Sequence, residues 1–139
     1  MKFVKRDPRA IIPQRKTKYS AGYDIHALDW GFIAPGETLI VKTGIGWTNA
    51  ANCVVGLVKP RSGHAFNYCI DTLAGVIDAD YRKENDEIRV LLINHGKEPF
   101  QFKAGQSIAQ MVITNYLMVD GDGYEDKPDR NGGYGSTDN

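Results

Sequence analysis

Residues 60–63 (PRSG) have the side chains of a phosphate-binding turn. Arg61 offers paired planar donors to phosphate oxygens, and Ser62 adds a hydroxyl. Gly63 lets the backbone approach a ligand closely, so that consecutive N–H groups can surround an anion. A turn that ends a strand, with its polar groups in solvent, has the same sequence pattern. The segment therefore indicates a phosphate cradle, and this structural alternative stays open.

Residues 75–81 (GVIDADY) place two carboxylates and a phenol directly after an apolar pair. In a strand, Asp78 and Asp80 point to one face and Tyr81 to the other. A carboxylate at the end of a buried strand can act as a general base toward water. Two carboxylates near a phosphate also suit Mg²⁺, which takes oxygen ligands and keeps several waters. A turn closed by aspartate caps is the alternative.

From about Val119 the chain becomes polar and glycine-rich, with too few apolar residues to fold alone. This segment could wrap a phosphorylated ligand, because it carries Arg130, Tyr134, Ser136 and Thr137 among glycines. A frayed terminus is the alternative, since chain ends are usually poorly ordered. Gln110 in an apolar run and Asp24 beside Gly22 are further polar candidates that say little by themselves.

Strands must position these side chains. Apolar residues alternate or form short β-branched runs, which predict strands at 39–41, 54–58, 88–93 and 108–113. Turn-forming residues separate the runs at 34–36, 43–46, 95–97 and 103–105. We therefore expect an all-β domain built as a sandwich, barrel or jelly roll, because these architectures protect sheet edges.

The length of the chain and its net charge limit the classes of protein to which it can belong. The chain has 139 residues, enough for one domain with a core. It has 17 Lys and Arg against 17 Asp and Glu, so no net positive field favours nucleic acid or a membrane surface. Apolar runs are too short to span a bilayer, and no signal region follows Met1. We expect a soluble, cytoplasmic protein in which Cys53 and Cys69 are reduced, mostly buried thiols.

In their order along the chain, these segments resemble the five motifs of the trimeric dUTPase family. The resemblance covers most of the chain, from Ala21 to Thr137. The matching segments are residues 21–25 (AGYDI), 60–65 (PRSGHA), 75–82 (GVIDADYR), 105–110 (GQSIAQ) and 130–137 (RNGGYGST). The second, third and fifth motifs are the most specific.

The resemblance implies an enzyme that hydrolyses dUTP to dUMP and pyrophosphate by attack of water on the α-phosphorus. Such an enzyme limits uracil in DNA and supplies dUMP for dTMP synthesis. The implied fold is a jelly roll or distorted β-barrel over residues 1–118. Residues 119–139 would form a flexible C-terminal arm that closes over the active site of a neighbouring subunit. The implied assembly is a homotrimer with three shared sites.

The resemblance also implies a role for each site residue. Asp78 would be the general base, Tyr81 would lie under the deoxyribose, and Asp24 would bind Mg²⁺ through water. Backbone groups of the hairpin between Gly75 and Arg89 would read uracil. The implied substrate-binding residues are Arg61, Ser62, Gly63, Thr72, Val76, Ile77, Tyr81, Arg89, Gln110, Arg130, Tyr134, Gly135, Ser136 and Thr137.

Two positions depart from the family pattern. A glycine usually follows the Tyr-Arg pair, whereas here residues 83–86 (KEND) make the tip longer and charged, next to the expected uracil pocket. His64 stands where an apolar residue is common; we expect a structural histidine, with a pH-sensitive contact as the alternative.

Two other functions compete with this interpretation. The dCTP deaminases resemble dUTPases in fold but need a catalytic Glu in the strand after the tyrosine, and residues 90–94 (VLLIN) contain none. A regulatory protein that binds a macromolecular partner through residues 83–87 is the second, although nothing in the sequence supports a particular partner. The intact set of Asp78, Tyr81, Arg61 and the arm favours catalysis.

Overall fold

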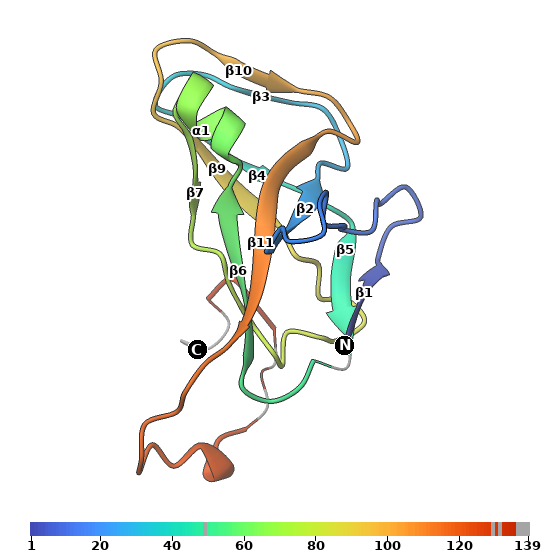
Figure 1. The fold of residues 1–139 in the computed structure, drawn as a ribbon, viewed down its shortest axis with the longest axis vertical. Coiled ribbons are helices and arrows are strands. Elements are labelled where there is room, and N and C mark those ends of the chain that lie inside the picture. Colours follow the sequence, from blue (N-terminus) through green and yellow to red (C-terminus); the bar gives the residue numbers. More distant parts are fainter. Residues whose placement is uncertain (49, 129, 131, 136–139) are drawn as a thin grey trace.

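The computed structural model describes residues 1–48, 50–128, 130 and 132–135 (Figure 1). Most of its regular structure is β. The strands are β1 (Lys2–Lys5), β2 (Gly22–His26), β3 (Gly31–Ile33), β4 (Thr38–Val41), β5 (Ile45–Thr48), β6 (Val54–Pro60), β7 (Ile70–Leu73), β8 (Val76–Asp78), β9 (Val90–Asn94), β10 (Phe100–Phe102) and β11 (Ser107–Asn115). The helices are α1 (Ser62–Tyr68) and the 3-10 turn η1 (Tyr124–Asp126).

All strand pairs are antiparallel, and they form two larger sheets and two ribbons. The larger sheets have the strand orders β2-β11-β6-β8 and β4-β9-β7, and the ribbons are β1-β5 and β10-β3. The inner faces pack together around Trp47, Ile25 and Leu92, which are fully buried. Gly56 lies under the side chain of Met111, where a Cβ would come within 2.1 Å of its methyl carbon. The expected all-β, jelly-roll-like domain is confirmed.

The four predicted strands are present as β4, β6, β9 and β11. Two local expectations were wrong. Ile45 and Gly46 begin β5 and are not part of a turn. Residues 62–68, directly after the expected phosphate turn, form α1, a helix in which every residue is described and none is buried. With no apolar stripe to bury, the helix has no periodic signal in the sequence.

Both cysteines are free thiols, but the expectation that they are buried was wrong for Cys69, which is exposed, while Cys53 is half-buried. Each adopts a left-handed backbone conformation, with φ of 63° at Cys53 and 57° at Cys69. Cys69 ends α1 in this conformation, and its N–H donates to the carbonyls of the last turn. Its position is therefore set by the helix end and not by core packing.

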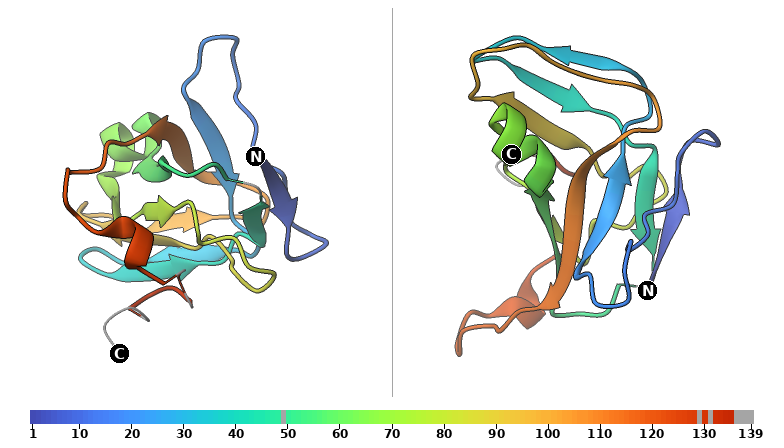
Figure 2. Two further views of the ribbon diagram at one scale, coloured as in Figure 1. Left: turned by 90° about the horizontal axis from the view of Figure 1, so that it is seen from below. Right: turned by 45° about the horizontal axis from the view of Figure 1, so that its top comes forward.

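The segment after β11 leaves the body of the domain at the lower end of Figure 1 and then turns back toward it (Figures 1 and 2). It begins with an exposed apolar run in which Leu117 is 97% and Val119 80% exposed. Its later residues return to the β-domain, where Arg130 and Tyr134 contact the site described below. No helix in the described part of the chain has the length and apolar character needed to cross a membrane.

Candidate active site

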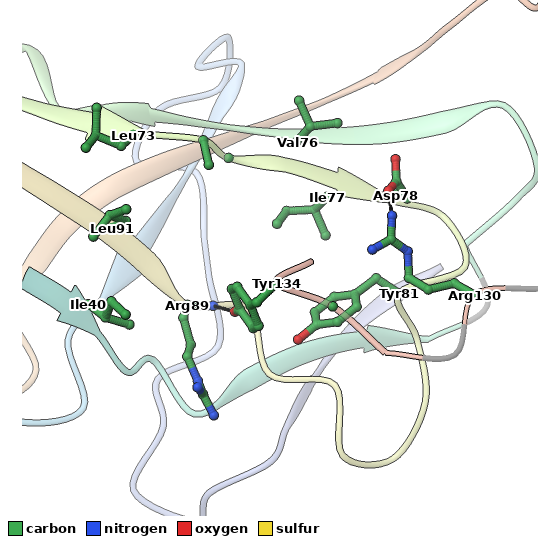
Figure 3. A pocket seen from close by; sticks show the side chains of 13 residues that line it. Ile40, Leu73, Val76, Ile77, Asp78, Tyr81, Arg89, Leu91, Arg130 and Tyr134 are labelled. Carbon is green, nitrogen blue, oxygen red and sulfur yellow. Dashed lines mark hydrogen bonds and ion pairs between the residues drawn. The ribbon is translucent and has the colours of Figure 1, made fainter. Parts of the chain in front are cut away.

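A pocket of about 240 Å³ lies beside the point where β7 passes into β8 (Figure 3). Its apolar walls come from β4, β7, β8 and β9 and from the turn at Ala74, while its polar groups come from the end of β8, the segment after it and the arm. The apolar lining is Ile40, Leu73, Ala74, Val76, Ile77 and Leu91, and the polar lining is Asp78, Tyr81, Arg89, Arg130 and Tyr134, with Gly75 and Gly133. This combination suits a ligand with one apolar face and several polar groups.

The turn between β7 and β8 shapes the mouth of the pocket. Ala74 and Gly75 both have positive φ, 56° and 103°, and the chain bends at these two residues as it passes from the β4-β9-β7 sheet to the β2-β11-β6-β8 sheet. The carbonyl of Gly75 accepts a hydrogen bond from the Val58 N–H at 2.8 Å, which fixes the turn to β6. A non-glycine residue in this conformation costs about 1–3 kcal/mol. Strain of this kind, at Ala74, is typical of functional sites.

Asp78 and Asp80 converge on one arginine of the arm. Asp78 ends β8, where it lies opposite Val55 of β6, and its carboxylate binds the Arg130 guanidinium. Asp80 accepts a hydrogen bond from the backbone N–H of Arg130 at 3.0 Å, and its other oxygen lies 3.4 Å from Arg130 Nε. Both carboxylates therefore contact the same arginine, although the strand ends at Asp78 and Asp80 lies in the turn that follows. The contact of Asp80 was not revealed by the sequence.

Tyr81 forms a rigid wall of the pocket. Its side chain is buried, its hydroxyl donates to the Glu87 carbonyl at 2.9 Å, and its own carbonyl accepts from Trp47 Nε1 at 2.8 Å. Burial raises the pKa of the Tyr81 phenol, so the ring stays neutral. Gly133 packs on this ring, and a Cβ there would lie 2.7 Å from a ring carbon.

Tyr134 reaches two backbone groups beside the pocket. Its hydroxyl donates to the Glu87 carbonyl at 2.9 Å and accepts from the Arg89 N–H at 3.0 Å. Its ring meets the edge of Tyr81 with centroids 6.2 Å apart, and the Arg89 guanidinium lies 5.5 Å from the ring centroid. The Glu87 carbonyl and the Arg89 N–H are therefore one acceptor and one donor joined by the same hydroxyl, and Figure 3 shows Arg89 beside Tyr134. This pair is complementary to the imide of a pyrimidine, which offers an N–H and a C=O.

A second polar cluster forms where β2, β11 and the start of α1 meet. Gln110 lies opposite Asp24 in the sheet and donates to the Pro60 carbonyl at 3.0 Å. Asp24 lies between two cations, with Arg61 Nε at 3.6 Å and Lys16 Nζ at 3.6 Å. Ser62 and Gly63 begin α1 beside Arg61. None of these residues belongs to the described lining of the pocket, so one chain holds two separate groups of expected site residues.

Asp24 is the expected magnesium residue. Its side chain is 13% exposed, and Oδ2 is buried without a hydrogen-bond partner among the described residues. A single carboxylate of this kind fits Mg²⁺, which is commonly held by one or two carboxylates, waters and substrate phosphates. Within the described part of the chain no three His, Cys, Asp or Glu side chains gather into a metal-binding group.

The remaining expected residues lie at varied distances from the pocket. Thr72 is on β7 opposite Leu92, and its hydroxyl faces the Val58 carbonyl at 3.5 Å, but it does not line the pocket. Gly135 is exposed with φ of 94°. Ser136 and Thr137 lie outside the described residues. His64 packs on Phe100 with ring centroids 4.9 Å apart, and burial, helped by the nearby Arg61, lowers the pKa of its imidazole.

Several lining residues were not expected from the sequence. Ile40 and Leu73 both lie directly opposite Leu91, one on each neighbouring strand, so the three side chains form one row across the sheet. Burial alternates along β4: Val41 is buried, whereas Ile40 is 62% exposed. Ile40 therefore faces away from the core. Glu87 was also not expected. It does not line the pocket, but its backbone carbonyl accepts from the hydroxyls of Tyr81 and Tyr134, which do.

Comparison with known proteins gives consistent results. A family model described as dUTPase matches residues 8–137. A deoxyuridine 5'-triphosphate nucleotidohydrolase of Nautilia profundicola is 39% identical over 142 residues, which cover 99% of this chain and 97% of that protein. The corresponding protein of Mus musculus is 39% identical over 140 residues, covering 99% and 84%. The crystal structure of a dUTPase from Streptococcus mutans has a TM-score of 0.75 at 24% identity and covers 87% of this chain and 100% of that one, a likeness of fold.

Proposed function

The chain belongs to the dUTPase family, and on that premise we propose that it hydrolyses dUTP to dUMP and pyrophosphate by attack of water on the α-phosphorus. The observation that carries the proposal is the pocket. It combines apolar walls with Asp78, Tyr81 and Arg89. The Glu87 carbonyl is not part of the lining, but it accepts hydrogen bonds from the hydroxyls of Tyr81 and Tyr134, which are.

Asp78 is the general base of this proposal. Its side chain is 43% exposed at the end of β8, where a water can reach it while the backbone stays fixed on β6. The carboxylate would take a proton from the water as the oxygen attacks in line with the leaving pyrophosphate. In the described chain Arg130 binds this carboxylate. The γ-phosphate would draw the guanidinium away, since phosphate offers more negative charge, and Asp78 would then be free to orient water.

Tyr81 and the backbone pair would select the nucleoside. The Tyr81 ring cannot rotate freely because its hydroxyl is held by Glu87, so it would leave no space for a ribose 2′-hydroxyl. The Glu87 carbonyl accepts and the Arg89 N–H donates, which matches the N3–H and a carbonyl of uracil. Cytosine has an unprotonated N3 at that position and would leave the carbonyl unpaired. Val76 and Ile77 line the same pocket, where a thymine methyl would have to fit.

The phosphates would be bound by the second cluster. In it, Arg61 pairs with Asp24, Gln110 lies opposite Asp24 in the sheet, and Ser62 and Gly63 follow Arg61 at the start of α1. This cluster is separate from the base pocket in one chain, which supports the proposal that a complete site combines subunits of a homotrimer. Arg130 and Tyr134 contact the pocket of their own chain here, and in the trimer the arm would make the same contacts on a neighbour. Asp24 would hold Mg²⁺ through water, and the ion would neutralise phosphate charge. Cytoplasmic localisation stays a prediction.

Pyrophosphate release from dUTP, UTP, dTTP and dCTP, each measured with Mg²⁺ and with a chelator, tests the proposal. We expect rapid release from dUTP alone, and a large loss of rate with the chelator. No release from dUTP would rule out the proposed activity. Release from UTP or dTTP at a comparable rate would retain phosphate cleavage but overturn the assigned roles of Tyr81 and of the base pocket.

A further inference from the structure

The segment that carries the Glu87 carbonyl and the Arg89 N–H has little regular structure. Residues 79–89 connect β8 to β9 without belonging to a strand, and residues 82–85 are exposed. A loop of this length would be mobile unless side chains from elsewhere fixed its backbone. The Glu87 carbonyl and the Arg89 N–H, which both bond the Tyr134 hydroxyl, nevertheless need fixed positions, because hydrogen bonding to a base depends on distance and angle.

Arg6 supplies donors from the N-terminal part of the chain. Its Nη2 donates to the carbonyls of Lys83 at 2.5 Å and Arg82 at 3.4 Å, and its Nε donates to the Asp86 carbonyl at 3.3 Å. Three carbonyls of one loop thus accept from one guanidinium, whose planar geometry allows several simultaneous bonds. The loop also braces itself, since the Lys83 N–H donates to the Asp86 carboxylate at 2.7 Å.

Gly46 on β5 makes room for this contact. A Cβ at Gly46 would lie 2.7 Å from Arg6 Nε and 2.7 Å from the Asp86 carbonyl oxygen. The guanidinium and the loop therefore pack directly on the backbone of β5. Since β5 pairs with β1, which ends one residue before Arg6, the arginine extends from an ordered strand pair.

Glu87 fixes the other end of the same loop. Its Oε1 accepts from the N–H groups of Thr43 at 3.2 Å and Gly44 at 2.9 Å, and its carboxylate is 15% exposed. The carbonyl of Gly44 in turn accepts from the N–H of Arg6 at 2.7 Å. Gly44 therefore binds Glu87 through its N–H and the backbone of Arg6 through its C=O, so Arg6 and Glu87 are both fixed to the same residue.

We propose that Arg6 and the Glu87 carboxylate are positioning residues for base recognition, which fix the loop of residues 82–89 so that the Glu87 carbonyl and the Arg89 N–H meet the pyrimidine. This inference rests on the proposed function and extends it to residues outside the pocket. The loop is longer than the family pattern by the charged segment 83–86, and Arg6 binds that segment. Asp78 is held independently on β8, so loss of the loop contacts should weaken substrate binding and base selection more than the chemical step.

Arg6→Met tests the inference, because methionine keeps much of the apolar stem and removes every donor. We expect the KM for dUTP to rise about tenfold, as for the loss of a charged hydrogen-bond donor, while kcat stays within about twofold. The ratio of kcat/KM for dUTP to that for dCTP should fall, and Arg6→Lys should restore part of both effects. Arg9→Met is the matched control, since Arg9 is exposed and forms ion pairs with Asp7 and Asp29.

A second pair of variants covers the case in which Arg6→Met fails to fold. Glu87→Gln keeps an oxygen that can accept from Thr43 and Gly44, whereas Glu87→Ala removes it, so only the alanine variant should show the raised KM. A folded Arg6→Met protein with the KM and base selectivity of the wild type would overturn the inference alone. Equal KM values in the Glu87→Ala and Glu87→Gln proteins would also overturn this inference. A wild-type protein that releases no pyrophosphate from dUTP would instead overturn the proposed function, and this inference with it.

Discussion

The hydroxyl of Tyr134 donates to the carbonyl of Glu87 at 2.9 Å, the same carbonyl that accepts from the Tyr81 hydroxyl. Together with its bond from the Arg89 N–H, Tyr134 engages both backbone groups assigned to uracil. The arm and the base therefore compete for one pair of hydrogen-bonding groups, and nucleotide binding requires the Tyr134 hydroxyl to leave.

Tyr134→Phe tests this competition, since phenylalanine keeps the aromatic ring and lacks the hydroxyl. A hydrogen bond contributes about 1 kcal/mol net, and less at an exposed side chain such as that of Tyr134. Because the nucleotide no longer has to displace these bonds, we expect the KM for dUTP to fall about two- to fivefold, with kcat little changed. Steady-state kinetics of the two proteins provide the measurement. An unchanged or higher KM would show that the hydroxyl does not oppose the nucleotide.

Asp78→Asn keeps the shape of the proposed base and removes its ability to take a proton. We expect kcat to fall by about 10²–10⁴-fold, the usual contribution of general acid–base catalysis, while dUTP still binds. Binding can be followed by calorimetry with the inactive variant. Asp29→Asn is the control, because Asp29 is exposed and pairs with Arg9 away from the pocket. Retained turnover in the Asp78 variant would remove this residue from the mechanism.

Deletion of residues 130–139 should suppress turnover without unfolding the β-domain, since Arg130 and residues 132–135, the part of this segment that the structure describes, contribute nothing to the core. Thermal melting and pyrophosphate release check the two halves of this prediction. A deletion protein with an unchanged rate would leave the arm without a catalytic role.

Co-expression of the arm-deleted chain with the Asp78→Asn chain tests whether the arm completes the active site of its own subunit or that of a neighbour. If the arm acts on a neighbour, mixed trimers contain sites with an intact Asp78 from one chain and an intact arm from another, and activity returns. Each homotrimer alone stays inactive in this design. Mixed trimers without activity would mean that the arm serves its own chain, as the Arg130–Asp78 contact within one chain does here.

His64 makes stability depend on pH in a defined direction. Burial lowers its pKa below the ordinary 6.5, so the unfolded chain binds more protons than the folded one. The free energy of unfolding should therefore be undiminished above pH 6.5 and decrease as the pH falls toward the lowered pKa of the folded state. Melting temperatures at pH 7.5 and 5.5 measure this loss, which His64→Leu should reduce. His95→Leu, at an exposed site, is the control; an equal pH dependence in all three proteins would exclude the role of His64.

Local pattern predicted the strands because they follow from the two-residue period of apolar side chains. It did not predict that β8 ends at Asp78, so that Asp80 reaches Arg130 from a turn. It missed α1, in which no residue is buried, and it missed Arg6, whose partners lie 76 to 80 residues away. Glu87 was missed because its contribution to the pocket is a backbone carbonyl, which no side-chain pattern marks. The roles of Asp24, Arg61 and Gln110 came from the family resemblance, and their separation from the pocket could be seen only in the folded chain.

The central claim is that water attacks the α-phosphorus of dUTP, and the fate of isotopic oxygen tests it most directly. Hydrolysis of dUTP by the wild-type protein in H₂¹⁸O, followed by mass spectrometry of both products, reports which phosphorus was attacked. The account predicts one ¹⁸O atom in dUMP and none in pyrophosphate. Label in pyrophosphate, or release of inorganic phosphate with dUDP, would contradict it.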